Sequence, residues 1–172
     1  NNIKVNHIAA IGDFEALSDE NCKRVNLSKE AFIEKLILSQ RKLKKVSGKK
    51  LETILFSDIC GGLKKWEKIH KKFFEMLINN NFGSSDLSFS KIKKISNARK
   101  PLLKRWFGDI TEKQILKFVL WQGAEYATMG YIIKKKFENP VIIGADHYKM
   151  APFYSLASDL PVLYLTSNYI RN

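Results

Sequence analysis

The segment 139–168 constrains the fold of this chain more than any other part of the sequence. It opens with an Asn-Pro dipeptide, which a helix does not easily cross, and continues into a β-branched run at 141–143. A short apolar run bounded by turn residues is typical of a buried strand. A helical segment over 149–157 then leads to a second apolar run at 162–165. Strand, helix and strand are therefore expected in close succession.

The elements before this segment extend the pattern to a parallel sheet. A long helix is expected over 111–137, because Thr111 and Gln114 form a capping box and apolar residues follow at helical spacing. A first strand is expected over 3–12. Helices and strands in alternation are typical of crossover connections between parallel strands. We therefore predict a helix-rich α/β fold with a small, mostly parallel Rossmann-like sheet, in a single domain spanning 1–172.

Polar side chains follow the predicted strands. Asp146 and His147 come directly after the strand at 141–143, and Asp13 follows the strand at 3–12. Ligands of open parallel sheets bind beyond the carboxyl ends of the strands. A carboxylate and an imidazole there could act as acid and base, as metal ligands or as contacts to ribose or phosphate. Asp146, His147 and Asp13 are therefore our candidate catalytic residues; the alternative is an Asp that caps the next helix beside a surface His.

A divalent metal is a further hypothesis for the same edge of the sheet. The segment 51–60 is ambiguous between a strand and a short helix, and as a strand it would place Asp58 at its end. Asp13, Asp58 and Asp146 would then share one rim and could hold a divalent metal with an attached phosphate. The alternative is that all three are structural turn residues, so no metal ligands are assigned.

Positive charge is concentrated in the middle of the chain. The net charge is +13, and residues 23–105 contain 22 Lys or Arg against 7 Asp or Glu, whereas the remaining residues contain 8 against 10. Such an asymmetry favours a polyanionic partner or an anionic surface. Because 25 of the 30 basic residues are Lys, the alternative is compositional drift in a Lys-rich sequence, without a role in binding.

The basic segment, 27–107, is expected to be mainly helical. Apolar residues of 63–79 recur on one face with lysines on the other, and a second basic stretch covers 89–107. Exposed Lys and Arg would neutralise the phosphates of RNA or DNA, and Trp66 and Trp106 could stack on bases, with core packing as the alternative. The candidate nucleic-acid-binding residues are Lys64, Lys65, Lys68, Lys71, Lys72, Lys93, Lys94, Arg99, Lys104 and Arg105.

Several common types of site have no signature in this sequence. There is no GxGxxG, P-loop, HExxH, GxSxG or CxxC pattern. Cys22 and Cys60 lack the spacing of metal ligands and are expected to be a reduced pair. No run approaches the ~20 apolar residues of a membrane span, so we expect no transmembrane segment and a cytoplasmic protein.

The end of the chain resembles the closing part of some Rossmann-type bacterial glycosyltransferases. The similar stretches are GYIIKKKFENPVIIGADHY and VLYLTSN, in which a helix leads into a strand ending in Gly-x-Asp and a last strand ends in a Ser/Asn turn. The opening IAAIGDFEALS is similar to their first strand and loop, without the Gly-Pro-Ser expected there. Deoxyribosyltransferase-type folds and transfer-RNA-using transferases align with the chain in a comparable way. The resemblance implies a transferase with a nucleotide-activated donor.

These observations lead to two function hypotheses of different classes. In the first, the chain binds a polyanion, RNA or DNA, and the polar residues at the strand ends support chemistry on it. In the second, it is a glycosyltransferase-like enzyme with a nucleotide-activated donor and with Asp146 and His147 in its site. A purely structural or interaction domain is a third alternative. The expected partner is thus a nucleic acid or a nucleotide, and the sequence leaves open whether the chain is an enzyme.

Overall fold

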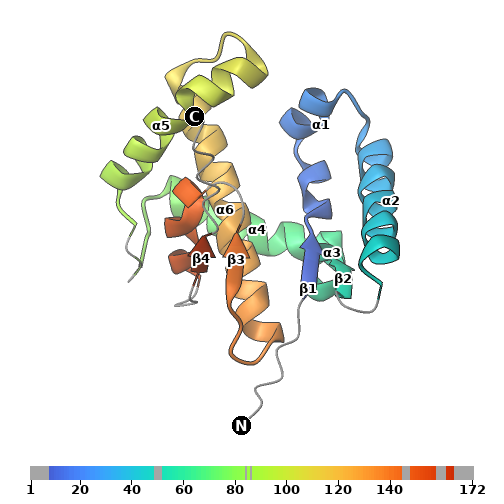
Figure 1. Cartoon of the computed structure of the whole chain (residues 1–172). Helices are drawn as coiled ribbons and strands as arrows, with labels where there is room; N and C mark the ends of the chain where they lie inside the picture. Colours follow the sequence, from blue (N-terminus) through green and yellow to red (C-terminus); the bar gives the residue numbers. More distant parts are fainter. Residues whose placement is uncertain are drawn as a thin grey trace, which may run out of the picture. The chain divides into compact units, whose positions relative to one another are not determined.

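The computed structural model shows a helix-rich chain that divides into two compact units, Asn1–Glu67 and Lys68–Asn172 (Figure 1). The boundary falls within helix α4 (Leu63–Ile78), so this helix contributes residues to both units. The basic segment 27–107 also contributes to both. A single domain over 1–172 stays a prediction. The structure describes residues 8–48, 52–83, 85, 87–144, 148–157 and 162–164.

The first unit begins with two short strands that are joined through helices. Strands β1 and β2 pair in parallel, with Ile8 opposite Glu52 and Ile11 opposite Leu55. The segment 51–60, which the sequence left ambiguous between a strand and a short helix, contains both: a strand in its first half and a short helix directly after it. The elements are β1 (Ile8–Ile11), η1 (Asp13–Leu17), α1 (Asp19–Val25), α2 (Lys29–Ser47), β2 (Glu52–Leu55) and α3 (Phe56–Cys60).

Helix α1 lies in the segment 14–26, which is rich in acidic residues and has a composition typical of a loop. The hydroxyl of Ser18 caps it, accepting a hydrogen bond from the backbone N–H of Asn21 at 3.2 Å. The helix ends at Asn26, whose φ of 53° is the left-handed conformation that terminates many helices. The next helix, α2, begins after Ser28, whose hydroxyl accepts a hydrogen bond from the backbone N–H of Ala31 at 3.2 Å. Local capping thus determines both helix starts.

Three aromatic side chains form the centre of the first unit. Phe14 and Trp66 are stacked, with ring centroids 4.0 Å apart and planes 12° apart. Phe56 packs edge-on against both, with centroids 5.7 Å from Phe14 and 5.3 Å from Trp66. All three are buried, and Phe14 lies 42 residues before Phe56 in the sequence.

The second unit is built around the long helix α6. Besides its part of α4 it contains α5 (Phe89–Phe107), α6 (Glu112–Lys136), β3 (Ile142–Gly144), the 3₁₀ helix η2 (Tyr148–Leu156) and β4 (Val162–Tyr164). Strands β3 and β4 pair in parallel, with Ile142 opposite Val162. Helix η2 packs closely on α6, because Gly123 leaves room for the ring of Phe153. A Cβ atom at Gly123 would lie 2.3 Å from that ring.

The two long helices of this unit follow their sequence signals. Helix α6 starts with the predicted capping box, in which Gln114 N–H donates to the Thr111 hydroxyl at 3.3 Å and Thr111 N–H donates to the Gln114 side chain at 2.8 Å. Helix α5 continues through Pro101 without a break. On its inner face, the apolar residues Ile92 and Leu103 have no exposed surface. Proline has no N–H group, so one backbone hydrogen bond of the helix is missing at Pro101. The packing of Ile92 and Leu103 compensates for this loss, and the helix stays continuous.

The prediction of a Rossmann-like sheet is wrong. The strands in the described residues are three or four residues long and pair only two by two, β1 with β2 and β3 with β4. The two pairs belong to different units, so no larger sheet joins them among the described residues. The physical reason is that helices bury most of the apolar surface. In the second unit the core consists chiefly of residues from α4, α5, α6 and η2, which leaves little apolar surface for a sheet to cover.

No helix in the described part of the chain combines the length and the apolar character that a bilayer crossing requires.

Candidate nucleic-acid interface

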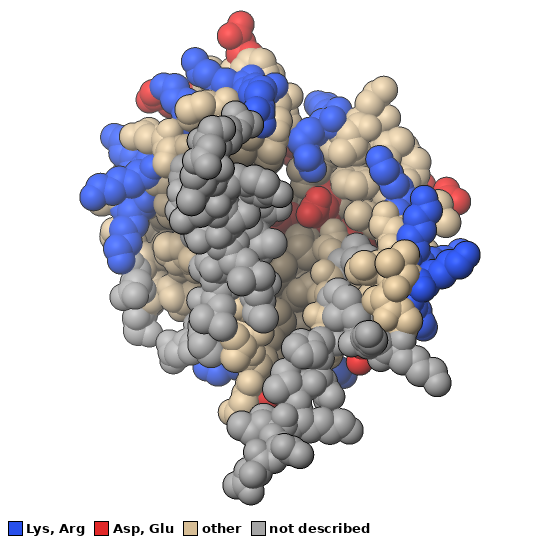
Figure 2. Space-filling model, in the orientation of Figure 1, with Lys and Arg blue, Asp and Glu red and all other residues tan. Residues whose placement is uncertain are grey.

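Helix α5 has the most one-sided charge of the helices that the structure describes. Its 19 residues include seven Lys or Arg and no Asp or Glu. Figure 2 shows basic side chains gathered over this helix, at the upper left of the view. Five of these cations are exposed: Lys91, Lys93, Lys94, Lys104 and Arg105. They form a surface that we call the α5 basic face.

The packing of α5 determines which way this face points. Ile92, Ile95 and Leu103 recur at helical spacing and are buried against the core of the second unit. A helix that buries this stripe must turn Lys93 and Lys104 to the opposite side, where both are exposed. The basic face is therefore a consequence of core packing and has a defined geometry along the helix.

The carboxylate of Glu112 borders the α5 basic face. Lys100 Nζ lies 2.8 Å from Glu112 Oε1 at the start of α6, and both side chains are on the surface. The hydrogen bond and the charge of Lys100 lower the pKa of Glu112, and the charges of Lys93 and Lys104 lower it further. Glu112 is therefore ionised at neutral pH. It neutralises the charge of Lys100 more than it neutralises the charges of Lys93 and Lys104.

Helix α4 also exposes its predicted basic residues, but its polar surface is mixed. Lys64, Lys65, Lys68, Lys71 and Lys72 are all exposed. Two exposed carboxylates, Glu67 and Glu75, lie on the same helix, and each is four residues from Lys71. At that spacing a carboxylate and an ammonium are neighbours on a helix surface. The positive potential of α4 is thus reduced by its own acidic residues.

Arg99 is not part of the exposed surface. It is one of the predicted nucleic-acid-binding residues, but only 3% of its surface is exposed. Helical periodicity explains this position, because Arg99 lies seven residues after Ile92 and four before Leu103, on the buried side of α5. The basic composition of α5 as a whole gave no indication that Arg99 is buried.

The aromatic residues offer little surface for base stacking. Trp66 is 1% exposed and belongs to the aromatic centre of the first unit. Phe73 is buried, and Phe74 packs partly buried against the core of the second unit. Trp106 is half-buried and packs edge-on against Phe107 with ring centroids 6.3 Å apart. Charge rather than stacking is therefore the main property of the basic helices.

The candidate catalytic residue Asp13 is a buried structural partner of Ser57. Only 2% of Asp13 is exposed. Its Oδ1 accepts the backbone N–H of Ser57 at 2.9 Å, and its Oδ2 accepts the Ser57 hydroxyl. Because each carboxylate oxygen already accepts a hydrogen bond, this arrangement connects the segments that follow β1 and β2. A catalytic role for Asp13 stays a prediction.

The remaining strand-end candidates are not brought together by the described residues. Asp146 and His147 lie outside the residues that the structure describes. Asp58 is exposed on α3, whereas Asp13 is buried. Within the described ranges no group of three or more His, Cys, Asp or Glu side chains is arranged to hold a metal ion. The hypothesis of a divalent metal therefore gains no support from this geometry.

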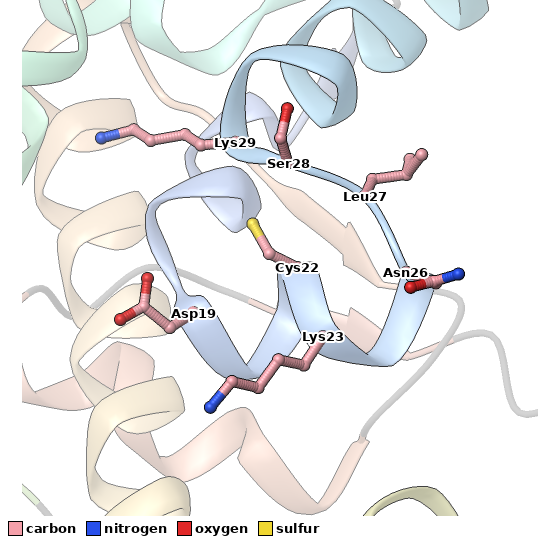
Figure 3. A pocket seen from close by; sticks show the side chains of 7 residues that line it. All are labelled: Asp19, Cys22, Lys23, Asn26, Leu27, Ser28 and Lys29. Atoms are coloured by element: carbon pink, nitrogen blue, oxygen red, sulfur yellow. The ribbon is translucent and has the colours of Figure 1, made fainter.

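A pocket of about 460 Å³ lies in the first unit, where α1 meets α2 (Figure 3). The side chains of Asp19, Lys23 and Lys29 extend to one side of it in this view. Cys22 lines the pocket as a free thiol and donates to the backbone oxygen of Ala16 at 3.5 Å. Burial and the nearby charge of Asp19 raise the pKa of Cys22, so it is protonated at neutral pH and is a poor nucleophile.

Sequence reasoning missed a buried polar group in the second unit. Glu125 lies in the middle of α6 and is only 4% exposed. It interacts electrostatically with Arg99 on α5. A single Glu inside the apolar stretch of a long helix could have indicated a buried ion pair. A glutamate is rarely buried unless it has a charged partner.

Comparison with known proteins returns no match to this chain among protein-family models, curated proteins or solved structures.

Proposed function

We propose that the chain binds the sugar–phosphate backbone of RNA or DNA through the α5 basic face. The observation that carries the proposal is the presence of five exposed cations on a 19-residue helix without a single carboxylate. Lys and Arg that neutralise phosphates release condensed counterions, which supplies binding free energy without any sequence information.

The length of the face suits a nucleic-acid strand. Lys91 and Arg105 are fourteen positions apart, which corresponds to about 21 Å along a helix that rises by about 1.5 Å per residue. One strand of B-form DNA carries a phosphate about every 3.4 Å, so a strand beside the helix would present about six phosphates to it.

The chemistry of the face favours binding without sequence preference. Four of its five cations are Lys, which acts as a flexible point charge, whereas bidentate reading of guanine is typical of Arg. The buried position of Trp66 further reduces the means of reading bases. A cytoplasmic location and chemistry at Asp146 and His147 stay predictions, and no described residue favours the transferase alternative.

The experiment is fluorescence anisotropy with labelled single- and double-stranded RNA and DNA over a series of salt concentrations. The test variant combines K93E, K94E, K104E and R105E. Its matched control combines K64E, K68E, K71E and K72E on α4, which changes the net charge equally. The binding constant K falls as salt is added, so a plot of log K against log salt has a negative slope. We expect the α5 variant to make this slope shallower by about 3–4, and we expect the control to retain most of the binding.

Two results would contradict the proposal. One is an absence of binding by the unmodified protein even at low salt. The other is an equal loss in the two variants, because it would show that net charge rather than the α5 basic face determines the affinity.

A further inference from the structure

Arg99 has unused hydrogen-bonding capacity inside the second unit. Its exposed fraction is 3%, and it lies on the side of α5 that packs against the core. Neither Nε nor Nη2 has a hydrogen-bond acceptor among the residues that the structure describes. Both atoms are sealed from solvent, so bulk water does not satisfy them in this conformation.

Such an arrangement is costly for a residue that only fills the core. A buried N–H group without an acceptor loses its hydration without replacement, and the loss is larger for a charged group. Burial lowers the pKa of Arg99, while Tyr126 and Glu125 on α6 act in the opposite direction. Glu125 therefore balances part of the charge, but the Nε–Nη2 edge still has no acceptor in the described structure.

The two atoms lie on the same edge of the guanidinium group. Their N–H bonds are parallel, which is the geometry that receives two oxygens of a carboxylate or a phosphate. The neighbours of Arg99 on α6 are polar as well, since Glu125 and Tyr126 act electrostatically on its guanidinium group.

We propose that the Nε–Nη2 edge of Arg99 binds a small oxyanion, a carboxylate or a phosphate, between α5 and α6 of the second unit. The anion supplies the two acceptors that the described residues do not provide, and it balances the part of the Arg99 charge that Glu125 leaves over. The ligand is small, because both nitrogen atoms are enclosed by protein. Entry requires a local opening of the packing around Arg99. The proposal is independent of nucleic-acid binding at the exposed face of the same helix.

The direct test observes the Arg99 side chain in the unmodified full chain. The ¹⁵N-labelled protein is titrated with sodium phosphate and, separately, with sodium acetate, at an ionic strength held constant with chloride. We expect the Arg99 Nε–H resonance, assigned through its backbone connectivity, to shift and saturate with one of the two anions. A phosphate response assigns a phosphate ligand and an acetate response assigns a carboxylate. An unchanged Arg99 resonance with both anions would overturn the proposal.

Thermal unfolding provides a second measurement with a matched pair of variants. At a few times its dissociation constant the active anion should raise the Tm of the unmodified protein by about 2–4 °C. R99K keeps the charge but removes the planar edge, so it should lose this rise. R105K makes the same change at an exposed position of α5 and should keep it. A rise that persists in R99K would show that the anion binds elsewhere.

Discussion

Ser57 donates both its backbone N–H and its hydroxyl to the carboxylate of Asp13, which lies 44 residues earlier in the chain. The two residues follow the paired strands β1 and β2, so their hydrogen bonds hold together the ends of both strands. Phe14 directly follows Asp13, and Phe56 directly precedes Ser57. These two rings pack edge-on in the same unit. The hydrogen bonds between Asp13 and Ser57 therefore lie next to the aromatic centre of the first unit.

Removal of the hydrogen bonds between Asp13 and Ser57 should destabilise the protein. D13A leaves the buried N–H and hydroxyl of Ser57 without their acceptor, and we expect it to lower the free energy of unfolding by about 1–3 kcal/mol. S57A keeps the backbone hydrogen bond and should cost less. The measurement is urea unfolding followed by circular dichroism. S39A is the control, because the Ser39 hydroxyl is exposed, and equal stability of D13A and S39A would refute the structural role of Asp13.

The close contact between Gly123 and Phe153 leads to a second prediction. Alanine normally stabilises a helix relative to glycine, but a methyl group here would meet the buried ring of Phe153. We expect G123A to destabilise the protein by about 1–3 kcal/mol through overpacking. The F153L substitution reduces the ring to an aliphatic side chain, so the double variant G123A/F153L should be less destabilised than the sum of the single variants. Additive effects in thermal unfolding would contradict the contact.

The capping box of α6 can be tested by a conservative pair of substitutions. T111A removes the hydroxyl that accepts the Gln114 N–H, and it should cost about 0.5–2 kcal/mol of stability. T111S retains a hydroxyl at the same position and should remain close to the unmodified protein. Chemical unfolding of both variants gives the comparison. If T111A and T111S were equally stable, the hydrogen bond would have no energetic role.

The ion pair at the border of the α5 basic face predicts a pH dependence. Lys100 lowers the pKa of Glu112 in the folded state, so the contribution of this pair to stability is present above the ordinary pKa of a glutamate. It is lost as the pH falls through the lowered pKa of the folded state. The contribution is small because the pair is exposed. NMR titration of the Glu112 carboxyl carbon should therefore show a higher pKa in K100M than in the unmodified protein, and an unchanged value would contradict the contact.

Much of the secondary structure could be predicted because its signals are local. Thr111 and Gln114 lie within one helical turn, and the cap of α2 at Ser28 needs only the next three residues. The apolar run before Gly144 is likewise a strand in the structure. Each of these signals depends on neighbours in the sequence, so no knowledge of the tertiary structure was needed to interpret it.

The sequence by itself determined the positions of these helices and strands and the excess of positive charge on α5. Only the tertiary structure decided how the strands pair, because a short apolar run carries no information about which other run lies beside it. It also decided the burial of Arg99, which has the same type of side chain as the exposed Arg105 six residues later. Burial depends on which side of α5 meets the core, and that is determined by packing between segments distant in the sequence.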